Sequence, residues 1–235
     1  MIGELAIIQK YRKWFDWSFL AVGLLIQVIT YWITARGQVL TADGGAIGPL
    51  SLVSGCLGVC SVCLTAQGNI WTFLFGFGQV ATYTFLCLRA HLYGEVAINM
   101  YYFLTMIYGV YVWRRRLNPA NEHRVRTRRL PLAVLLTIAV SVLVLSGGVG
   151  WLLATYTDDP TPYLDAFTTI TALVAQVLMI LVYSDQWFLW MAVDLTSVAM
   201  WIIIGDYCMT AQYAFWCCNC VYGYLRWRSL GISSE

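Results

Sequence analysis

The residues best suited to bind a small molecule form a stripe of tryptophans around one carboxylate. Trp187, Trp190, Asp194, Ser197 and Trp201 are spaced at i, i+3, i+7, i+10 and i+14, which places them along one face of a helix. Asp194 is the only carboxylate well inside an apolar segment, where an ionisable side chain is costly and usually functional. Indole faces attract cations, and a nearby carboxylate adds to that attraction. The stripe predicts a site for a flat cationic ring, although a protonated Asp194 would act as a neutral donor and acceptor, like Asn.

Amide side chains lie at comparable depth in other apolar segments. They are Gln79, Asn99, Gln176 and Asn219. Amides at this depth could line a pocket near the membrane midplane that binds a polar ring bearing hydroxyls. They could equally join helices through hydrogen bonds worth about 0.6–2 kcal/mol each. We expect Trp71 and Tyr83, on the third apolar segment, to belong to the same substrate-binding pocket.

The composition around these residues is that of a multi-pass membrane protein. The chain is 60% hydrophobic and 11% charged, whereas about a quarter of the residues of a soluble domain are charged. Apolar stretches of about 20 residues, enough to cross a ~30 Å hydrocarbon core, recur from end to end. They predict eight helical spans, at 17–34, 47–66, 70–88, 94–113, 131–154, 163–183, 187–204 and 208–227. We expect residues 1–16 to form an interfacial helix and residues 228–235 a cytoplasmic tail.

The distribution of basic residues predicts that both chain termini are cytoplasmic. With an even number of spans and the N-terminus inside, twelve of the fourteen Lys and Arg residues lie on the cytoplasmic side, and only Arg36 and Arg89 lie outside. Seven of the twelve fall in segment 114–130, which we interpret as a basic cytoplasmic loop that touches anionic headgroups. The net charge of +2 therefore reflects topology, and we expect no nucleic-acid partner.

The sequence offers little support for metal, cofactor or enzyme chemistry. All eight cysteines lie within or at the ends of predicted spans and no His lies inside one, so we expect no disulfide framework, metal ion or cofactor. No Gly-x-Ser-x-Gly motif and no buried carboxylate pair occurs. The only lysines are Lys10 and Lys13, which excludes a retinal Schiff base in a late span. A transporter is favoured; a channel or a structural membrane protein would not predict saturable binding of a ligand.

One phrase occurs twice, as YGVYVWR from Tyr108 and YGYLRWR from Tyr222, 114 residues apart. A Trp-Arg pair alone is typical of an aromatic belt with a snorkelling cation, but that does not explain the shared Tyr-Gly. The copies are four spans apart, so both end a helix that runs in the same direction. Tyr108 and Tyr222 are predicted to pack or to gate.

The repeat predicts two parallel three-helix bundles, a known construction for transporters. The bundles are 47–113 and 163–227, joined by the apolar linker helix 131–154, with span 17–34 as an additional peripheral helix. Leu92-Tyr93-Gly94 pairs with Asp206-Tyr207-Cys208, and Asn69-Ile70-Trp71 pairs with Asp185-Gln186-Trp187.

Several of these motifs resemble the PnuC family of nicotinamide riboside transporters. They are NIWTFLFGFGQV, LYGEVAINMYYFLTMIYGVYVWRRR, DQWFLWMAVDLTSVAMW and YGYLRWR, within about residues 67–116 and 163–228. The resemblance implies a SWEET-like all-α membrane fold, a homotrimer in the inner membrane, and facilitated diffusion of nicotinamide riboside. In that family a cytoplasmic kinase traps the substrate by phosphorylation.

The same resemblance identifies substrate-binding positions in the seventh span. The family's Trp-x-x-Trp-x-x-x-Asn pattern falls on Trp187, Trp190 and Asp194, with Asp where Asn is usual. Relatives of similar appearance carry thiamine or other vitamins, and a carboxylate favours a cation. Because nicotinamide riboside and thiamine are both cationic, the substitution does not separate them. Proton-coupled transport through Asp194 is a further alternative.

Overall fold

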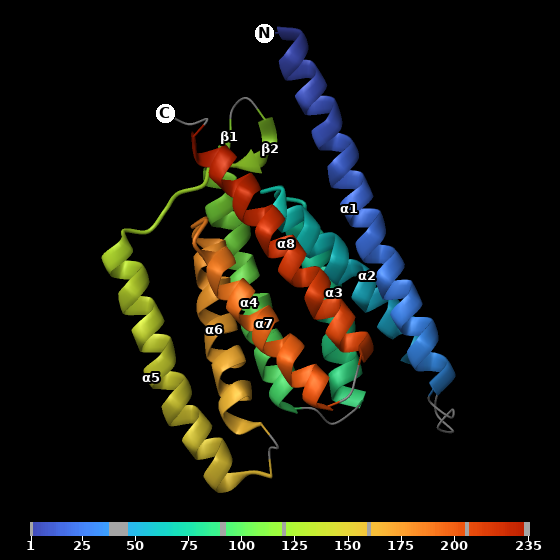
Figure 1. Ribbon diagram of the computed structural model, residues 1–235, viewed down its shortest axis with the longest axis vertical. Helices are drawn as coiled ribbons and strands as arrows, with labels where there is room; N and C mark the ends of the chain where they lie inside the picture. The colour runs from blue at the N-terminus through green and yellow to red at the C-terminus, as the bar shows by residue number, and fades with distance from the viewer. Residues whose placement is uncertain are drawn as a thin grey trace.

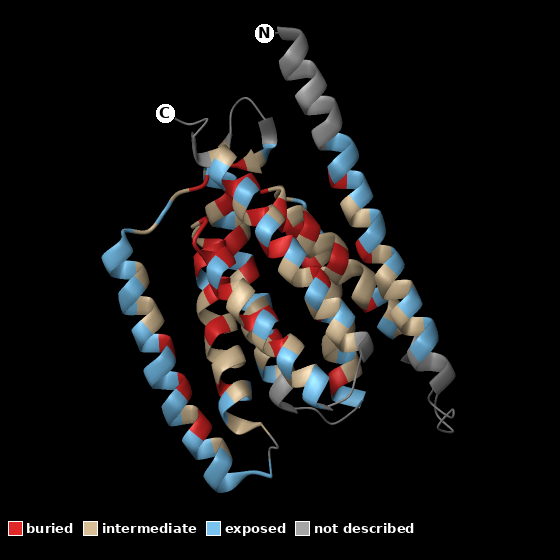
Figure 2. Ribbon diagram, in the orientation of Figure 1, coloured by how far each residue is buried: buried red, intermediate tan, exposed pale blue. Residues whose placement is uncertain are grey.

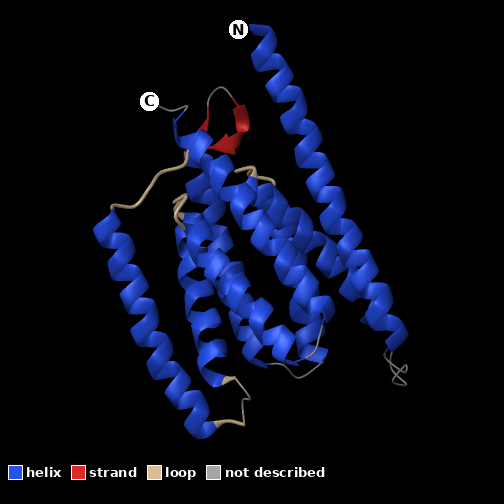
Figure 3. Ribbon diagram, viewed as in Figure 1, coloured by secondary structure: helices blue, strands red, loops and turns tan. Residues whose placement is uncertain are grey.

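The apolar segments form long helices that run side by side (Figure 1). The computed structural model describes residues 2–37, 47–89, 93–118, 121–158, 161–204 and 207–232. These residues form helices α1 (Ile2–Gly37), α2 (Ile47–Ala66), α3 (Thr72–Arg89), α4 (Tyr93–Arg115), α5 (Leu132–Tyr156), α6 (Pro162–Ile180), α7 (Gln186–Ile204) and α8 (Tyr207–Ile232), and a hairpin of β1 (Leu117–Asn118) and β2 (Asn121–Val125). Figure 3 shows that this short hairpin interrupts an otherwise helical molecule. The predicted all-α membrane fold is confirmed.

Six helices of the described chain are long and apolar enough to cross a membrane: α1, α2, α4, α5, α6 and α7. The other two helices, α3 and α8, are not among these candidates, and both carry polar side chains, among them Gln79 on α3 and Asn219 and Arg226 on α8. Polar groups on a membrane helix are tolerated where they face other helices. The protein is therefore a multi-pass membrane protein, and Asn219 and Arg226 are buried among its helices.

The helix contacts divide the described helices into two sets of three, α2–α4 and α6–α8, which we call the two bundles. Within each bundle the second helix packs against the first and the third. Between bundles, the first helix of each packs against the third helix of the other, α2 against α8 and α4 against α6. Helix α5 packs against α6 and is exposed along most of its length (Figure 2). It has the position expected of a lipid-facing linker.

Backbone hydrogen bonds set the register of the repeat at a constant offset of 114 residues. At the end of α2, Gly68 N–H donates to Thr65 O at 2.9 Å; at the end of α6, Val182 N–H donates to Met179 O at 3.0 Å. Gly68 and Val182 have positive φ values of 65° and 64°, a region that a β-branched side chain rarely adopts.

This register corrects the pairing of Trp71 with Trp187. At a constant offset, Phe73 is the equivalent of Trp187, and Trp71 is the equivalent of Asp185. Sequence similarity alone pairs the two tryptophans because their residue types are identical. The turn geometry instead pairs residues that occupy the same place in the two backbones. The two halves therefore share a backbone path while differing in their chemistry.

Helix α1 is joined to the second bundle by a buried ion pair. It runs without a break across residue 16, so the predicted boundary there between an interfacial helix and a span is wrong. The carboxylate of Asp16 accepts hydrogen bonds from the Tyr222 hydroxyl and, at 2.7 Å, from the Arg226 guanidinium. Asp16 and Arg226 are both buried. Tyr222 therefore packs against α1, whereas its repeat equivalent Tyr108 is exposed.

Basic residues gather where α4 and α8 end, beside the hairpin, and we call this the basic end of the molecule. Helix α1 begins at the same end (Figure 1). The hairpin covers the bundles there: Val125 is buried, and its N–H donates to Gly68 O at 3.0 Å in the turn after α2. The described part of segment 114–130 thus packs against the bundles and includes a hairpin.

Candidate substrate-binding site

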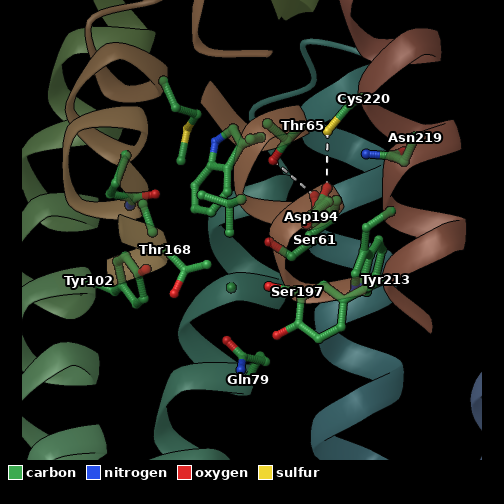
Figure 4. A pocket seen from close by; sticks show the side chains of 18 of the residues that line it. Ser61, Thr65, Gln79, Tyr102, Thr168, Asp194, Ser197, Tyr213, Asn219 and Cys220 are labelled. Carbon is green, nitrogen blue, oxygen red and sulfur yellow. Dashed lines mark hydrogen bonds between the residues drawn. The ribbon is translucent and has the colours of Figure 1, made fainter. Parts of the chain in front are cut away.

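A cavity of about 510 Å³ lies between the two bundles. Helices α2, α3 and α4 line one side, and α6, α7 and α8 line the other, without α1 or α5. Small-molecule sites commonly have volumes of about 300–1,000 Å³. Figure 4 shows labelled polar side chains from both bundles projecting into this space. The cavity has the size and position expected of a transporter site between repeats.

The whole α7 stripe lines the cavity, as the helical spacing predicts. Its members are Trp187, Trp190, Asp194, Ser197 and Trp201. Asp194 is 6% exposed, and its Oδ2 accepts a hydrogen bond from Cys220 Sγ at 3.2 Å (Figure 4). No Lys or Arg of the described chain forms an ion pair with Asp194. The carboxylate therefore lies in the cavity with a thiol as its hydrogen-bond donor and without a cation from the protein.

Two buried side chains at the cavity have hydrogen-bonding groups that the protein does not satisfy. Both atoms of the Asn219 amide and the indole N–H of Trp187 have no partner among the described residues. Asn219 is 1% exposed and Trp187 is 3% exposed. A buried polar group left unpaired costs about 1–3 kcal/mol. These groups are therefore available to hydroxyl or amide groups of a ligand.

The other two amides at the cavity differ in how far the protein uses them. Gln79 lines the cavity from α3. Gln176 lines it from α6, and its Nε2 donates to Thr105 Oγ1 on α4 at 3.4 Å. That contact joins α6 to α4, so Gln176 both lines the pocket and connects helices, the two roles considered for the amides.

Three predicted site residues lie away from the cavity. Asn99 is buried but is not among the α4 residues that line the cavity, which are Ile98, Tyr102 and Met106. Trp71 is 50% exposed and precedes α3. Tyr83 follows the part of α3 that reaches the cavity, which ends at Val80. We do not retain these three residues as ligand contacts.

Hydroxyl groups from α2 and α3 line the cavity and carried no signal in the sequence. Ser61, Thr65 and Thr72 form one network: the Thr72 and Thr65 hydroxyls are 2.7 Å apart, and Thr72 Oγ1 donates to Ser61 O at 2.8 Å. Small hydroxyl residues commonly bond to helix backbones, which conceals those that also face a site. Ser61 and Thr65 are four residues apart, so they lie on one face of α2, and this spacing is the sequence pattern that could have identified these two residues.

Two tryptophans close the cavity toward the basic end. Trp113 and Trp227 are both 0% exposed. Trp113 Nε1 donates to Met179 O at 3.2 Å, from the first bundle to the second, and Trp227 Nε1 donates to Thr65 O at 2.7 Å, from the second to the first. These residues are therefore not lipid-facing belt residues, and that interpretation of the Trp-Arg pair is wrong. They form reciprocal links between the bundles.

Aromatic rings extend this closure into the cavity. Phe73 packs edge-on against Trp113 at 5.1 Å between ring centroids, and Trp187 packs edge-on against Trp227 at 5.9 Å. We call Phe73, Trp113, Trp187 and Trp227 the aromatic closure.

The repeated glycines make room for these rings. A Cβ atom on Gly109 would lie 2.7 Å from the Phe73 ring, and one on Gly223 would lie 2.4 Å from the Trp187 ring. A side chain at either position would displace an aromatic ring of the closure. The repeated Tyr-Gly is thus explained by its glycine.

The cavity extends away from the basic end. Its lining includes Thr168 and Asp165 in the first turns of α6, and Asp165 is exposed. The structure therefore combines a closed basic end with a cavity that reaches the opposite end of the bundles.

Comparisons with known proteins agree with this architecture. The chain matches the family model described as nicotinamide mononucleotide transporter over residues 48–229, from α2 to α8. It is 31% identical over 192 residues to the nicotinamide riboside transporter PnuC of Neisseria mucosa, covering 77% of this chain and 72% of that protein. It is 28% identical over 225 residues to PnuC of Haemophilus influenzae, covering 93% and 91%.

A solved structure is also similar. It is described as the crystal structure of the vitamin B3 transporter PnuC, and it aligns with a TM-score of 0.74 and 26% identity over 94% of this chain and 93% of that one. These relatives are named as transporters, not as enzymes. The chain therefore belongs to the nicotinamide mononucleotide transporter family, which includes the PnuC vitamin transporters.

Proposed function

We propose that this protein carries nicotinamide riboside into the cytoplasm by facilitated diffusion. The names of its relatives support the substrate. The observation that carries the proposal is the set of unsatisfied groups on Trp187 and Asn219 beside the carboxylate of Asp194, all in the cavity between the bundles. A ligand with a cationic aromatic ring and several hydroxyls supplies the partners that these groups lack.

The two parts of the substrate match two kinds of lining. The cationic nicotinamide ring is assigned to the indole faces of Trp187 and Trp190, where a cation–π contact contributes about 0.5–2 kcal/mol, with Asp194 adding charge attraction. The ribose hydroxyls and the carboxamide are assigned to the amides of Gln79, Gln176 and Asn219, which also line the cavity.

The transport cycle would expose this cavity to each side of the membrane in turn. The positive-inside rule makes the basic end cytoplasmic and places both termini there. Substrate enters at the opposite end, and release requires the hydrogen bonds from Trp113 and Trp227 to break. Facilitated diffusion uses no coupling ion. Net accumulation therefore depends on a cytoplasmic kinase that phosphorylates the nicotinamide riboside after it has entered. We assign the protein to the inner membrane as a homotrimer, as the family resemblance implies.

Binding and uptake measurements test this function directly. Calorimetry on the purified protein with nicotinamide riboside, nicotinamide mononucleotide, thiamine and riboflavin is expected to show saturable binding of nicotinamide riboside. Proteoliposomes are expected to equilibrate the labelled riboside without a gradient and to accumulate it only when the kinase and ATP are inside. Absence of binding by the riboside would refute the assignment, and tighter binding of thiamine would support the alternative substrate.

The environment of Asp194 supports proton coupling as a second mechanism. The carboxylate is buried, receives a hydrogen bond from the Cys220 thiol and has no cationic partner in the described chain. A side chain in this position could carry a proton as access alternates. Uptake under an imposed pH gradient distinguishes the mechanisms: facilitated diffusion predicts an unchanged final level, whereas coupling predicts accumulation driven by the gradient.

A further inference from the structure

A second cavity, of about 660 Å³, lies at the basic end and shares no lining residue with the substrate cavity. Its lining combines the end of α4, the start of the hairpin, the segment after it and the turn after α6. The residues are Tyr108, Tyr111, Val112, Arg115, Arg116, Leu117, Arg126, Arg128 and Leu181. Four arginines thus converge on one hollow.

Backbone contacts and ring contacts hold these arginines close to one another. Arg126 N–H donates to Arg116 O at 2.9 Å, which brings the two residues together across the hairpin. Arg128 Nε donates to Leu181 O at 3.0 Å, and its guanidinium lies 4.1 Å from the centroid of the Tyr183 ring. The Arg115 guanidinium lies 4.2 Å from the Tyr111 ring centroid. The cationic groups are therefore positioned by the fold.

None of these four arginines forms an ion pair with a carboxylate of the described residues. The ion pairs of the basic end join Arg124 and Arg226 to Asp16, and none of these three residues lines this cavity. Like charges held together repel, and an anion between them removes that repulsion. Guanidinium groups bind phosphate oxygens in pairs, with fixed geometry.

The wall of the cavity that faces outward is typical of a lipid site. Tyr108 and Tyr111 are 55% and 50% exposed, and their rings stack at 6.2 Å. Leu104 and Ile107, one turn earlier on α4, are exposed and apolar. They belong to the span Val96–Arg115, whose last residue lines the cavity. Aromatic rings at this depth lie at the level of lipid headgroups.

We propose that this cavity binds the phosphate of an anionic phospholipid, with the acyl chains lying along the exposed face of α4. The headgroup phosphate accepts hydrogen bonds from Arg116 and Arg126, and Arg115 and Arg128 complete the cationic wall. The lipid site shares no residue with the substrate cavity, so this proposal does not depend on which substrate the protein carries.

The test compares two double variants that remove the same charge from the same segments. Arg116→Gln/Arg126→Gln changes the cavity, and Arg114→Gln/Arg129→Gln changes exposed arginines that do not line it. Native mass spectrometry in neutral detergent measures binding of added phosphatidylglycerol and phosphatidylcholine to the purified protein. The cavity variant is expected to lose about tenfold or more in affinity for phosphatidylglycerol. The control variant and the binding of phosphatidylcholine are expected to stay within about twofold of the original protein.

Two results would overturn the proposal. Equal losses in both double variants would show a general effect of surface charge. Competition by millimolar inorganic phosphate or glycerol 3-phosphate would show a site for soluble anions rather than for lipid. If the glutamine variant does not fold, Arg116→Lys/Arg126→Lys keeps the charge but removes paired hydrogen bonding. It is expected to lose affinity several-fold, and an unchanged affinity would contradict the site.

Discussion

Trp113 and Trp227, each from a different bundle, meet edge-on with their ring centroids 5.8 Å apart and their planes at 66°. Each also donates its indole N–H to a backbone carbonyl of the opposite bundle. The pair lies between the substrate cavity and the basic end, so any conformation that opens that end must separate these contacts.

Removal of one of these hydrogen bonds should weaken the junction between the bundles. Trp227→Phe keeps an aromatic ring but removes the indole donor, so Thr65 O keeps only its hydrogen bond from Gly68 N–H, at a cost of about 0.5–1.5 kcal/mol. We expect a fall of several degrees in the melting temperature of the purified protein. Trp151→Phe, on the exposed face of α5, is the matched control and should melt like the original protein. Equal melting temperatures for the two variants would contradict the role of the hydrogen bond.

The two repeated glycines should differ in their effect on binding. Gly223→Ala places a methyl group against Trp187, so we expect lower stability, by about 1–3 kcal/mol, and weaker substrate binding. Gly109→Ala acts on Phe73 and should lower stability with a smaller loss of affinity. Gly147→Ala, in open space on α5, should not destabilise the protein. Thermal melting and calorimetry separate the three cases, and identical affinities for the first two would refute the assignment of Trp187 to the site.

The carboxylate of Asp194 should recognise the charge of the ligand. Asp194→Asn is expected to weaken binding of nicotinamide riboside by about tenfold, equivalent to about 1.4 kcal/mol, because the charge attraction is lost. The uncharged dihydro form of the riboside should bind the variant and the original protein alike. Asp158→Asn, an exposed acid outside the cavity, controls for net charge. Parallel losses for both ligands in calorimetry would argue against a charge contribution.

The tryptophans of α7 should matter for binding where Trp71 does not. Trp190→Ala removes an indole face from the cavity and is expected to weaken riboside binding by more than about tenfold while the protein still folds. Trp71→Ala removes an exposed ring outside the cavity and should leave affinity unchanged. Calorimetry on both purified variants is the measurement. A loss at Trp71 as large as that at Trp190 would require the site to be placed elsewhere.

The attachment of α1 should depend on its buried carboxylate. Asp16→Asn leaves the Arg226 guanidinium buried without a counter-charge, a change that typically costs about 3–5 kcal/mol. Tyr222→Phe removes a single hydrogen bond to the same carboxylate and should cost about 1 kcal/mol. Thermal melting of the two purified variants tests this order, and a larger effect of Tyr222→Phe would contradict it.

The helices and the α7 site residues could be predicted because each depends on a local period. The length of an apolar run reflects bilayer thickness, and the 3.6-residue period places Trp187, Trp190 and Asp194 on one face whatever lies opposite. The same period places Asn99 on one face with Tyr102 and Met106, but it cannot show which side chains along that face reach the cavity, and Asn99 does not line it.

Tertiary structure alone decided how the two halves meet. The amino-acid sequence shows that a phrase repeats at an offset of 114 residues, but it does not show that the tryptophans of that phrase are buried and form hydrogen bonds between the bundles. A Trp at a helix end has the same sequence signature whether it faces lipid or another helix, because hydropathy does not distinguish the two surroundings. Only the packing of α2 against α8 and of α4 against α6 brings each indole to a carbonyl of the opposite bundle, and that packing depends on contacts between residues distant in the chain.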